Sequence, residues 1–482
     1  MVLRFMSFAV TAVVLVLGLV FAPAVALKID LSDASSSYEV KPIDQTMVCS
    51  GPLFLTGGLS GDNLGSFERT GEATLDFTAE GIGSVQLESI SRDSVELWPL
   101  ADGRVYYSKG ITNATELKNI DTNFDSPQGS IVLTGSTSQL VKLDSMRGLA
   151  GASCQEPSTD FWLVGGSSAD GREALLILSN PSPIDETVDI NIFTELGKIE
   201  VAGTTGISVL AQSTTVISLA SLAPSANALA VQVQSQGAKL AGWMQHRSVS
   251  GLESLGVDYV APAIAPGTEV VIPGLLVRGT ETINQVSQTE GIQDAGHALR
   301  VFAPTGATIA VQINSSSDDV FGSVLTETIE PGTVQDFPIT ELLDGEYTVF
   351  ITSDQPIYAS VRAAVGNDNG KPRIDFAWLG ASEVITSPRA VTTSAEFDSL
   401  LILGNPSGEA VTASITNLTT GITSRVSVPA SGTASLEITG AVAIESEVGI
   451  YASVVSQKDF QITAFGVSNQ TSVGGLVPVR FR

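Results

Sequence analysis

Histidine and cysteine are scarce in this chain, since each occurs only twice among 482 residues. Two residues of each kind cannot furnish a zinc site of the usual Cys/His spacing. A Ser-His-Asp triad would have to use His246 or His297, and neither lies near a Gly-x-Ser-x-Gly turn. We therefore predict no catalytic residue, no metal ligand and no cofactor. Both histidines are interpreted as surface residues or as residues at seams between modules.

Basic residues are also few, with 24 Lys and Arg against 51 Asp and Glu and a net charge of −27. This excess argues against nucleic acid and anionic membrane surfaces as partners, because both bind a basic face. It is compatible with calcium, with basic partners or simply with solubility. Residues 366–370 only superficially resemble a calcium loop, because an EF-hand frame would put Val365 and Phe376 at ligand positions. We predict a hairpin turn there.

A long uncharged apolar run occurs only near the N-terminus. Arg4 precedes an apolar segment from Phe5 to Phe21, and Ala24 and Ala26 offer a cleavage site before Leu27. These features predict a secretory signal peptide over residues 1–26. The run is about 17 residues long, at the lower limit for crossing a bilayer, so an uncleaved anchor is the alternative. The protein is expected outside the cell or in the cell envelope, with membrane contact only through this segment if it is uncleaved.

The two cysteines, Cys49 and Cys154, both lie in the part of the chain predicted to be exported. A pair of cysteines in an oxidising compartment indicates a disulfide. It would close a loop of about 100 residues, which is worth roughly 4–5 kcal/mol in the chain-entropy model. A reactive thiol is disfavoured, because neither cysteine has a histidine or a second cysteine close to it in the sequence.

One sequence segment recurs along the chain. Leu-Leu-Ile-Leu-Ser-Asn-Pro-Ser at residues 175–182 returns as Leu-Leu-Ile-Leu-Gly-Asn-Pro-Ser at residues 400–407, with a degenerate copy at residues 299–306. Each copy is followed by residues that alternate between apolar and polar or small, a period that indicates half-buried strands. We expect the repeated segments themselves to be buried central strands, because strands that are apolar on both faces would aggregate at a sheet edge. The Asn-Pro in each of the two best copies should end its strand, because proline has no N–H for the ladder.

The repeat unit of about 100 residues, with short strands and turns every 8–12 residues, predicts tandem immunoglobulin-like β-sandwich modules in an all-β chain. A β-propeller with two blades per unit is the alternative. The expected organisation is a signal peptide or anchor at 1–26, a flexible leader at 27–48, a divergent N-terminal β-domain at 49–157 and sandwich repeats at 158–257, 258–374 and 375–482.

Each sandwich repeat is preceded or opened by an acidic residue beside an aromatic one. These segments begin at Asp160, Asp258 and Asp375. An aromatic side chain at a module boundary buries a large area, so we predict that these rings pack between neighbouring modules. A ligand platform is the alternative.

Several motifs together resemble a known family. They occur in the order Cys-Ser-Gly-Pro-Leu (49–53), Arg-Gly-Leu-Ala (147–150), Trp-Leu-Val-Gly-Gly (162–166), the Leu-Leu-Ile-Leu copies and Val-Asp-Tyr-Val-Ala-Pro (257–262). From Cys49 onwards the chain resembles an uncharacterised family of actinobacterial exported proteins, the domain-of-unknown-function family 5719. Ser50 departs from the pattern, which would have proline there. The resemblance implies export and an envelope setting but no activity.

The sequence therefore predicts a non-enzymatic secreted or cell-envelope protein that presents β-modules to an extracellular or envelope protein or glycan. The alternative is a carboxylate-based glycan hydrolase or an envelope-processing accessory. That alternative would need a concave site with two carboxylates about 5–10 Å apart and with shifted acidity.

Overall fold

The structure is a computed structural model. It describes residues 35–40, 46–57, 66–80, 84–91, 93–100, 104–120, 132–290, 292, 294–316, 323–467 and 475–480. The chain forms two compact units, residues 1–43 with 473–482, and residues 44–472. The predicted signal peptide, residues 1–26, lies outside the described residues.

The first unit contains a pair of antiparallel strands, β1 (Ser35–Val40) and β36 (Gly475–Arg480). The range 27–48, where a flexible leader was expected, thus includes β1 and most of β2 (Thr46–Cys49). Its serine content does not prevent this, because backbone groups rather than side chains make the ladder hydrogen bonds.

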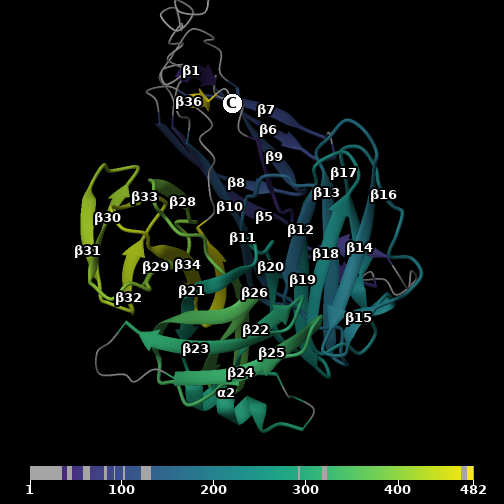
Figure 1. Cartoon of the computed structure of the whole chain (residues 1–482). Coiled ribbons are helices and arrows are strands. Elements are labelled where there is room, and N and C mark those ends of the chain that lie inside the picture. Colours follow the sequence, from purple (N-terminus) through teal and green to yellow (C-terminus); the bar gives the residue numbers. More distant parts are fainter. Residues whose placement is uncertain are drawn as a thin grey trace, which may run out of the picture. The chain divides into compact units, whose positions relative to one another are not determined.

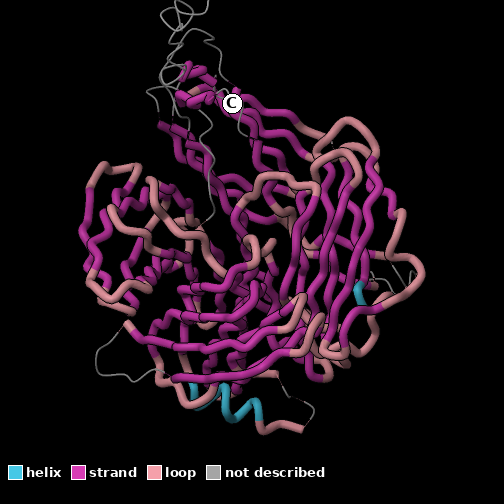
Figure 2. The backbone as a smooth tube through the Cα atoms, in the orientation of Figure 1, coloured by secondary structure: helices cyan, strands magenta, loops and turns pink. Residues whose placement is uncertain are grey.

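The second unit is built of antiparallel β-sheets, which confirms the all-β prediction (Figures 1 and 2). In residues 46–153 two four-stranded sheets enclose one core. The first has the order β2, β9 (Thr115–Ile120), β6 (Ser84–Ser89) and β7 (Val95–Pro99). The second has the order β11 (Arg147–Ser153), β10 (Val132–Lys142), β5 (Ala73–Glu80) and β8 (Arg104–Ile111). A short pair, β3 (Phe54–Thr56) and β4 (Phe67–Arg69), accompanies them.

The second sandwich spans residues 160–260. One sheet has the order β12 (Asp160–Val164), β18 (Leu229–Ser235), β14 (Glu186–Thr194) and β15 (Gly197–Ile199), with β16 (Ile207–Val209) also on β14. The other has the order β17 (Ser213–Ser218), β13 (Arg172–Asn180), β19 (Ala241–Ser250) and β20 (Glu253–Val260). A 3-10 turn, η4 (Leu219–Ser221), follows β17.

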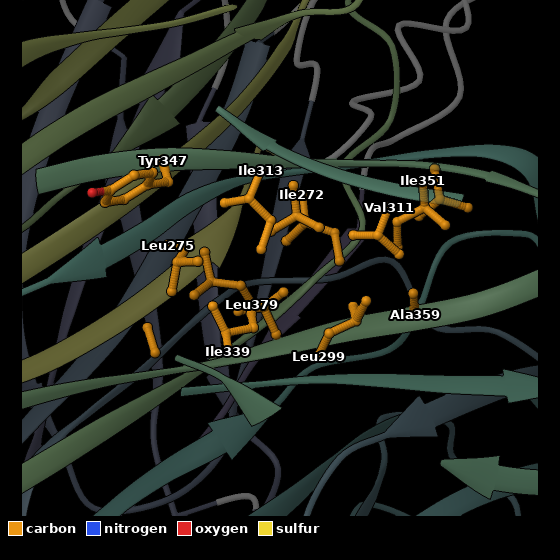
Figure 3. Packing of buried hydrophobic residues seen from close by; sticks show 14 of the residues in the cluster. Ile272, Leu275, Leu299, Val311, Ile313, Ile339, Tyr347, Ile351, Ala359 and Leu379 are labelled. Atoms are coloured by element: carbon orange, nitrogen blue, oxygen red, sulfur yellow. The ribbon is translucent and has the colours of Figure 1, made fainter. Parts of the chain in front are cut away.

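The third sandwich shares one long strand, β26 (Gly345–Asp368), between its two sheets. The first half of β26 pairs with β21 (Gly267–Val277) and with β23 (Ala307–Ser315), which pairs in turn with β24 (Ser323–Ile329). The second half pairs with β27 (Pro372–Gly380) and with β22 (His297–Ala303), which carries β25 (Thr333–Ile339). Figure 3 shows the apolar core between these sheets. Helix α2 (Thr280–Ser287) packs on β26 and β27.

The fourth sandwich spans residues 389–466. One sheet has the order β28 (Arg389–Thr392), β33 (Ala441–Ser446), β30 (Val411–Asn417) and β31 (Thr423–Val428). The other has the order β32 (Gly432–Ile438), β29 (Asp398–Asn405), β34 (Tyr451–Lys458) and β35 (Gln461–Gly466). The boundaries expected at 257/258 and 374/375 fall inside β20 and β27, and the four-domain division remains a prediction. Among the described residues no helix is long and apolar enough to cross a membrane.

The repeated segments form the strands that the sequence predicted. They are β13, β22 and β29, each with a neighbour on both sides and largely buried. Asn180 and Asn405 end their strands and are fully buried. The side-chain amide of Asn180 donates to the carbonyl of Val209, and that of Asn405 donates to the carbonyl of Val428. In both of the best copies the buried asparagine thus anchors the turn that follows the strand, while the turn residues themselves are half-buried or exposed.

Four strands, one from each sandwich, meet in the interior of the second unit. β11 contacts β20 and β35, and β27 contacts the same two strands. Each is the edge strand of its own sheet. The sandwiches therefore share a buried junction, which protects four sheet edges from solvent and from other chains.

Candidate functional site

A cavity of about 330 Å³ lies where the second and third sandwiches meet. Its lining includes both histidines of the chain, with His246 on β19 and His297 on β22. It also includes Arg300 on β22, Arg362 on β26 and Trp378 on β27. His246 is 1% exposed and His297 is 8% exposed, so neither is a surface residue. The interpretation of His246 as a seam residue is confirmed, because it contacts Trp378 of the next sandwich.

Arg300, which lines the cavity, and Arg172, which pairs with the lining residue Asp294, are each held by an aspartate through the same edge of the guanidinium group. Arg300 donates from Nε and Nη2 to the two carboxylate oxygens of Asp336, over 2.6 and 2.7 Å. Arg172 donates from the same two nitrogens to Asp294, over 2.7 Å from Nε. Such bidentate pairs are among the stronger charge-assisted hydrogen bonds.

A third arginine, Arg362, is held differently. It is 3% exposed, its guanidinium lies 4.6 Å from the ring centre of Phe376, and its Nη1 lies 3.6 Å from Asp294 Oδ2. Its Nε and Nη2 have no hydrogen-bond partner among the described residues. Burial alone would raise the pKa of Asp294, but Arg362 and Arg172 outweigh it and hold that pKa well below its usual range.

The hydrogen bonds at the histidines fix their tautomers. Trp378 Nε1 donates to His246 Nδ1 over 3.0 Å, and the backbone N–H of Ala364 donates to His297 Nδ1 over 3.1 Å. Each neutral ring therefore carries its proton on Nε2. Neither Nε2 has a partner within the described part of the chain. Burial, reinforced by Arg362, lowers the pKa of both rings, for His297 to about 4. Both are neutral donors near pH 7.

Sequence reasoning did not single out this cavity, because its residues come from five strands and a helix of two sandwiches. One signal was present. Arg300 and Arg362 interrupt strand segments that are otherwise apolar, 299–303 and 361–365. A charge in the middle of a buried strand is rare without a partner, so it points to a polar site.

The junction of the four strands holds two buried carboxylates. Asp258 on β20 accepts from the N–H of Gly151 on β11 (3.1 Å), from Thr463 Oγ1 on β35 (2.9 Å) and from the N–H of Trp378 on β27 (2.9 Å). One side chain thus satisfies groups of the three other strands. Burial raises the pKa of Asp258 well above its usual value, and these donors oppose the shift.

Asp375 on β27 acts in the same way. It accepts from the backbone N–H groups of Val257 (3.3 Å), Leu149 (3.1 Å) and Ile462 (3.0 Å). A Cβ added at Gly148 would lie 2.8 Å from Asp375 Oδ1, so only glycine permits this approach. Burial raises the pKa of Asp375 to about 8, although the backbone donors lower it in part. Neither Asp258 nor Asp375 lines the cavity.

The predicted packing of aromatic rings between sandwiches is confirmed at each acidic-aromatic segment. Trp162 of the second sandwich stacks on Phe302 and Tyr358 of the third, with ring centres 5.1 and 5.0 Å apart. Tyr259 donates its hydroxyl hydrogen to the carbonyl of Gly51 in the first sandwich. Trp378 packs in the core of the second sandwich.

Cys49 and Cys154 form a disulfide, as predicted, and both are fully buried. The bond joins the end of β2 to the residue that follows β11. Among the described residues no group of three or more His, Cys, Asp or Glu side chains could hold a metal ion.

The fold and the cavity define an all-β protein of packed sandwiches with a buried arginine- and histidine-lined cavity. The chain belongs to a family of unknown function, DUF5719, whose model matches residues 114–439. A search of curated proteins gives no match. One solved structure, described as a tetra-tandem repeat in the extending region of a large adhesion protein, is 12% identical. The alignment covers 86% of this chain and 94% of that one, but its TM-score of 0.11 is too low to support an argument.

Proposed function

We propose that this chain is a non-enzymatic exported protein of the cell envelope or extracellular space that binds a protein or glycan partner. The observation that carries the proposal is the cavity between the second and third sandwiches. Three side chains that line it, those of Arg362, His246 and His297, have buried N–H donors without an acceptor among the described residues. An unsatisfied buried donor costs about 1–3 kcal/mol, so a ligand that supplies acceptors would recover that free energy.

The same geometry favours binding over catalysis. A general base needs a free lone pair toward its substrate, but each histidine uses its Nδ1 lone pair within the protein and carries a proton on Nε2. Asp294 and Asp336 line the cavity, and both are paired with arginines. Because its pKa is low, Asp294 is ionised near neutral pH and has no proton to donate as a general acid. These features disfavour the carboxylate-based hydrolase.

Export is supported by the signal-like N-terminal sequence, the buried disulfide and the envelope setting that the family resemblance implies. If the segment is cleaved after Ala26, protein exported by its native host should have the intact mass of a chain that starts at Leu27. A mass that retains residues 1–26 would show an anchored protein instead.

The binding proposal can be tested with the exported chain and two leucine variants. Gly296 lines the cavity, and a Cβ added there meets no atom within 4 Å, so Gly296→Leu should narrow the cavity without a backbone clash. Gly408, in a turn of the fourth sandwich, has equal space, so Gly408→Leu is the matched control.

Each protein is used to capture partners from envelope extract and is probed on a glycan array. We expect the wild type and Gly408→Leu to retain the same partner and Gly296→Leu to lose it. New reducing ends released from envelope glycan would support the hydrolase. Equal capture by all three proteins would place the binding site elsewhere.

A further inference from the structure

The three arginines around the cavity differ in one respect that points to a ligand. Arg172 and Arg300 each direct the Nε/Nη2 edge at an aspartate carboxylate. Arg362 has the same edge buried and without a partner among the described residues. That edge presents two parallel N–H groups, spaced to match the two oxygens of a carboxylate. Within the chain, two carboxylates fill two of the three edges.

The charges near the cavity balance. Arg172, Arg300 and Arg362 carry three positive charges, and Asp294, Asp336 and Glu341 carry three negative ones, so the free edge of Arg362, and not a net charge, favours an anionic ligand. Two further donors at lining residues have no partner in the described part of the chain, namely the Nε2–H groups of the two neutral histidines. Glu341 also lines the cavity and is exposed, so it disfavours ligands with several negative charges.

We propose that the cavity binds a small organic acid, with its carboxylate on the Nε/Nη2 edge of Arg362 and with His246 and His297 as additional donors. The inference rests on the proposed binding function and specifies the chemistry of the ligand. A volume of about 330 Å³ is at the lower end for ligand sites, so the ligand is about the size of a sugar acid. A glycan partner would therefore place a single acidic sugar unit in the cavity.

The two histidines allow a direct test, because the chain contains no others. Imidazole ¹H–¹⁵N spectra of the full exported chain should show two rings, and variants at either position assign them. The probes are glucuronate against glucose and acetate against acetamide, with inorganic phosphate as a tetrahedral anion. We expect the acids to shift both ring signals and the neutral analogues to leave them unchanged. If none of the probes shifts the ring signals, or if only phosphate does, the proposal is overturned.

Arg362→Lys keeps the charge and removes the planar edge. We expect its affinity for glucuronate to fall at least about tenfold, because hydrogen bonds to a charged group are lost. Arg247→Lys is the matched control, since Arg247 lies on the same strand as His246, pairs with Glu173 and does not line the cavity. Unchanged affinity in a folded Arg362→Lys protein would contradict the site.

If Arg362→Lys does not fold, His297→Gln serves in its place, because it leaves Arg362 intact. The remaining His246 signal should still shift with glucuronate, with a weaker affinity. A signal that no longer responds, or an affinity equal to that of the wild type, would exclude the arrangement. A wild-type chain that captures its partner but does not respond to the acids would refute this inference alone. A wild-type chain that captures no partner would refute the proposed function.

Discussion

The backbone N–H of Trp378 donates a hydrogen bond of 2.9 Å to Asp258, a residue of the preceding sandwich. The indole N–H of the same tryptophan donates to His246 at the cavity. One residue of β27 thus belongs both to the junction of four edge strands and to the cavity wall. The positions of Trp378 and His246 in the cavity wall therefore depend on the junction, and substitutions at the junction should displace these two side chains.

The junction predicts an unusual pH dependence of stability. Burial raises the pKa of Asp375 from 3.8 to about 8, so the folded state holds this proton more tightly than the unfolded state. The stability it contributes is present below about pH 4 and is lost as the pH rises toward 8. Urea unfolding, followed by circular dichroism at several pH values between about 4 and 8, should show this decrease in the free energy of unfolding. Asp375→Asn should reduce this slope, and the part that remains is the contribution of Asp258, whose pKa is also raised by burial.

Asp375→Asn should also lower the free energy of unfolding by about 1–3 kcal/mol, because its amide replaces one acceptor oxygen with a donor that faces a backbone N–H. The exposed Asp368 is the control, and Asp368→Asn should keep the slope of the wild type. An Asp375→Asn protein with the wild-type slope would show that this carboxyl is not the titrating group.

His297 should affect stability in the opposite direction. Its pKa in the folded protein is about 4, below the usual 6.5, because burial disfavours the charged ring. The stability that this ring contributes is present above about pH 6.5 and is lost as the pH falls through 4. His297→Gln should flatten the acid side of the stability profile. An imidazole that titrates near 6.5 in an NMR titration would contradict the buried position.

The Cys49–Cys154 disulfide should leave no free thiol in exported protein. Thiol titration of the denatured, unreduced chain tests this, and the reduced chain is the control with two thiols. The double variant Cys49→Ser, Cys154→Ser should lose roughly 4–5 kcal/mol of stability in the chain-entropy model. Two reactive thiols in exported material would refute the bond outside the cell.

Leu401→Asp tests whether the sandwiches unfold separately. Leu401 is fully buried on β29, so an aspartate there should cost several kcal/mol. Since β35 of the same sandwich supplies donors to Asp258 and Asp375, we expect one calorimetric transition shifted as a whole. Leu196→Asp, at a position that is 89% exposed, should leave the transition unchanged. A separate early transition would support the independent domains that the repeat suggested.

The local sequence patterns predicted the strands well. The Leu-Leu-Ile-Leu copies, the alternating segments after them and the turn at residues 366–370 all depend on residues close in sequence, and they appear as β13, β29, β14, β30 and the β26–β27 hairpin. The boundaries between modules were harder to predict. An acidic-aromatic segment opens β12, but similar segments lie within β20 and β27, the last strands of their sheets.

The amino-acid sequence by itself determined the all-β class, the buried repeat strands, their ends at Asn-Pro and the pairing of the only two cysteines, because each follows from local periodicity or from elimination. Only the tertiary structure decided the junction and the cavity. Asp258 and Asp375 satisfy backbone groups of strands far away in sequence. His246, His297 and Arg362 approach one another because two sandwiches pack together, and no local pattern records that contact.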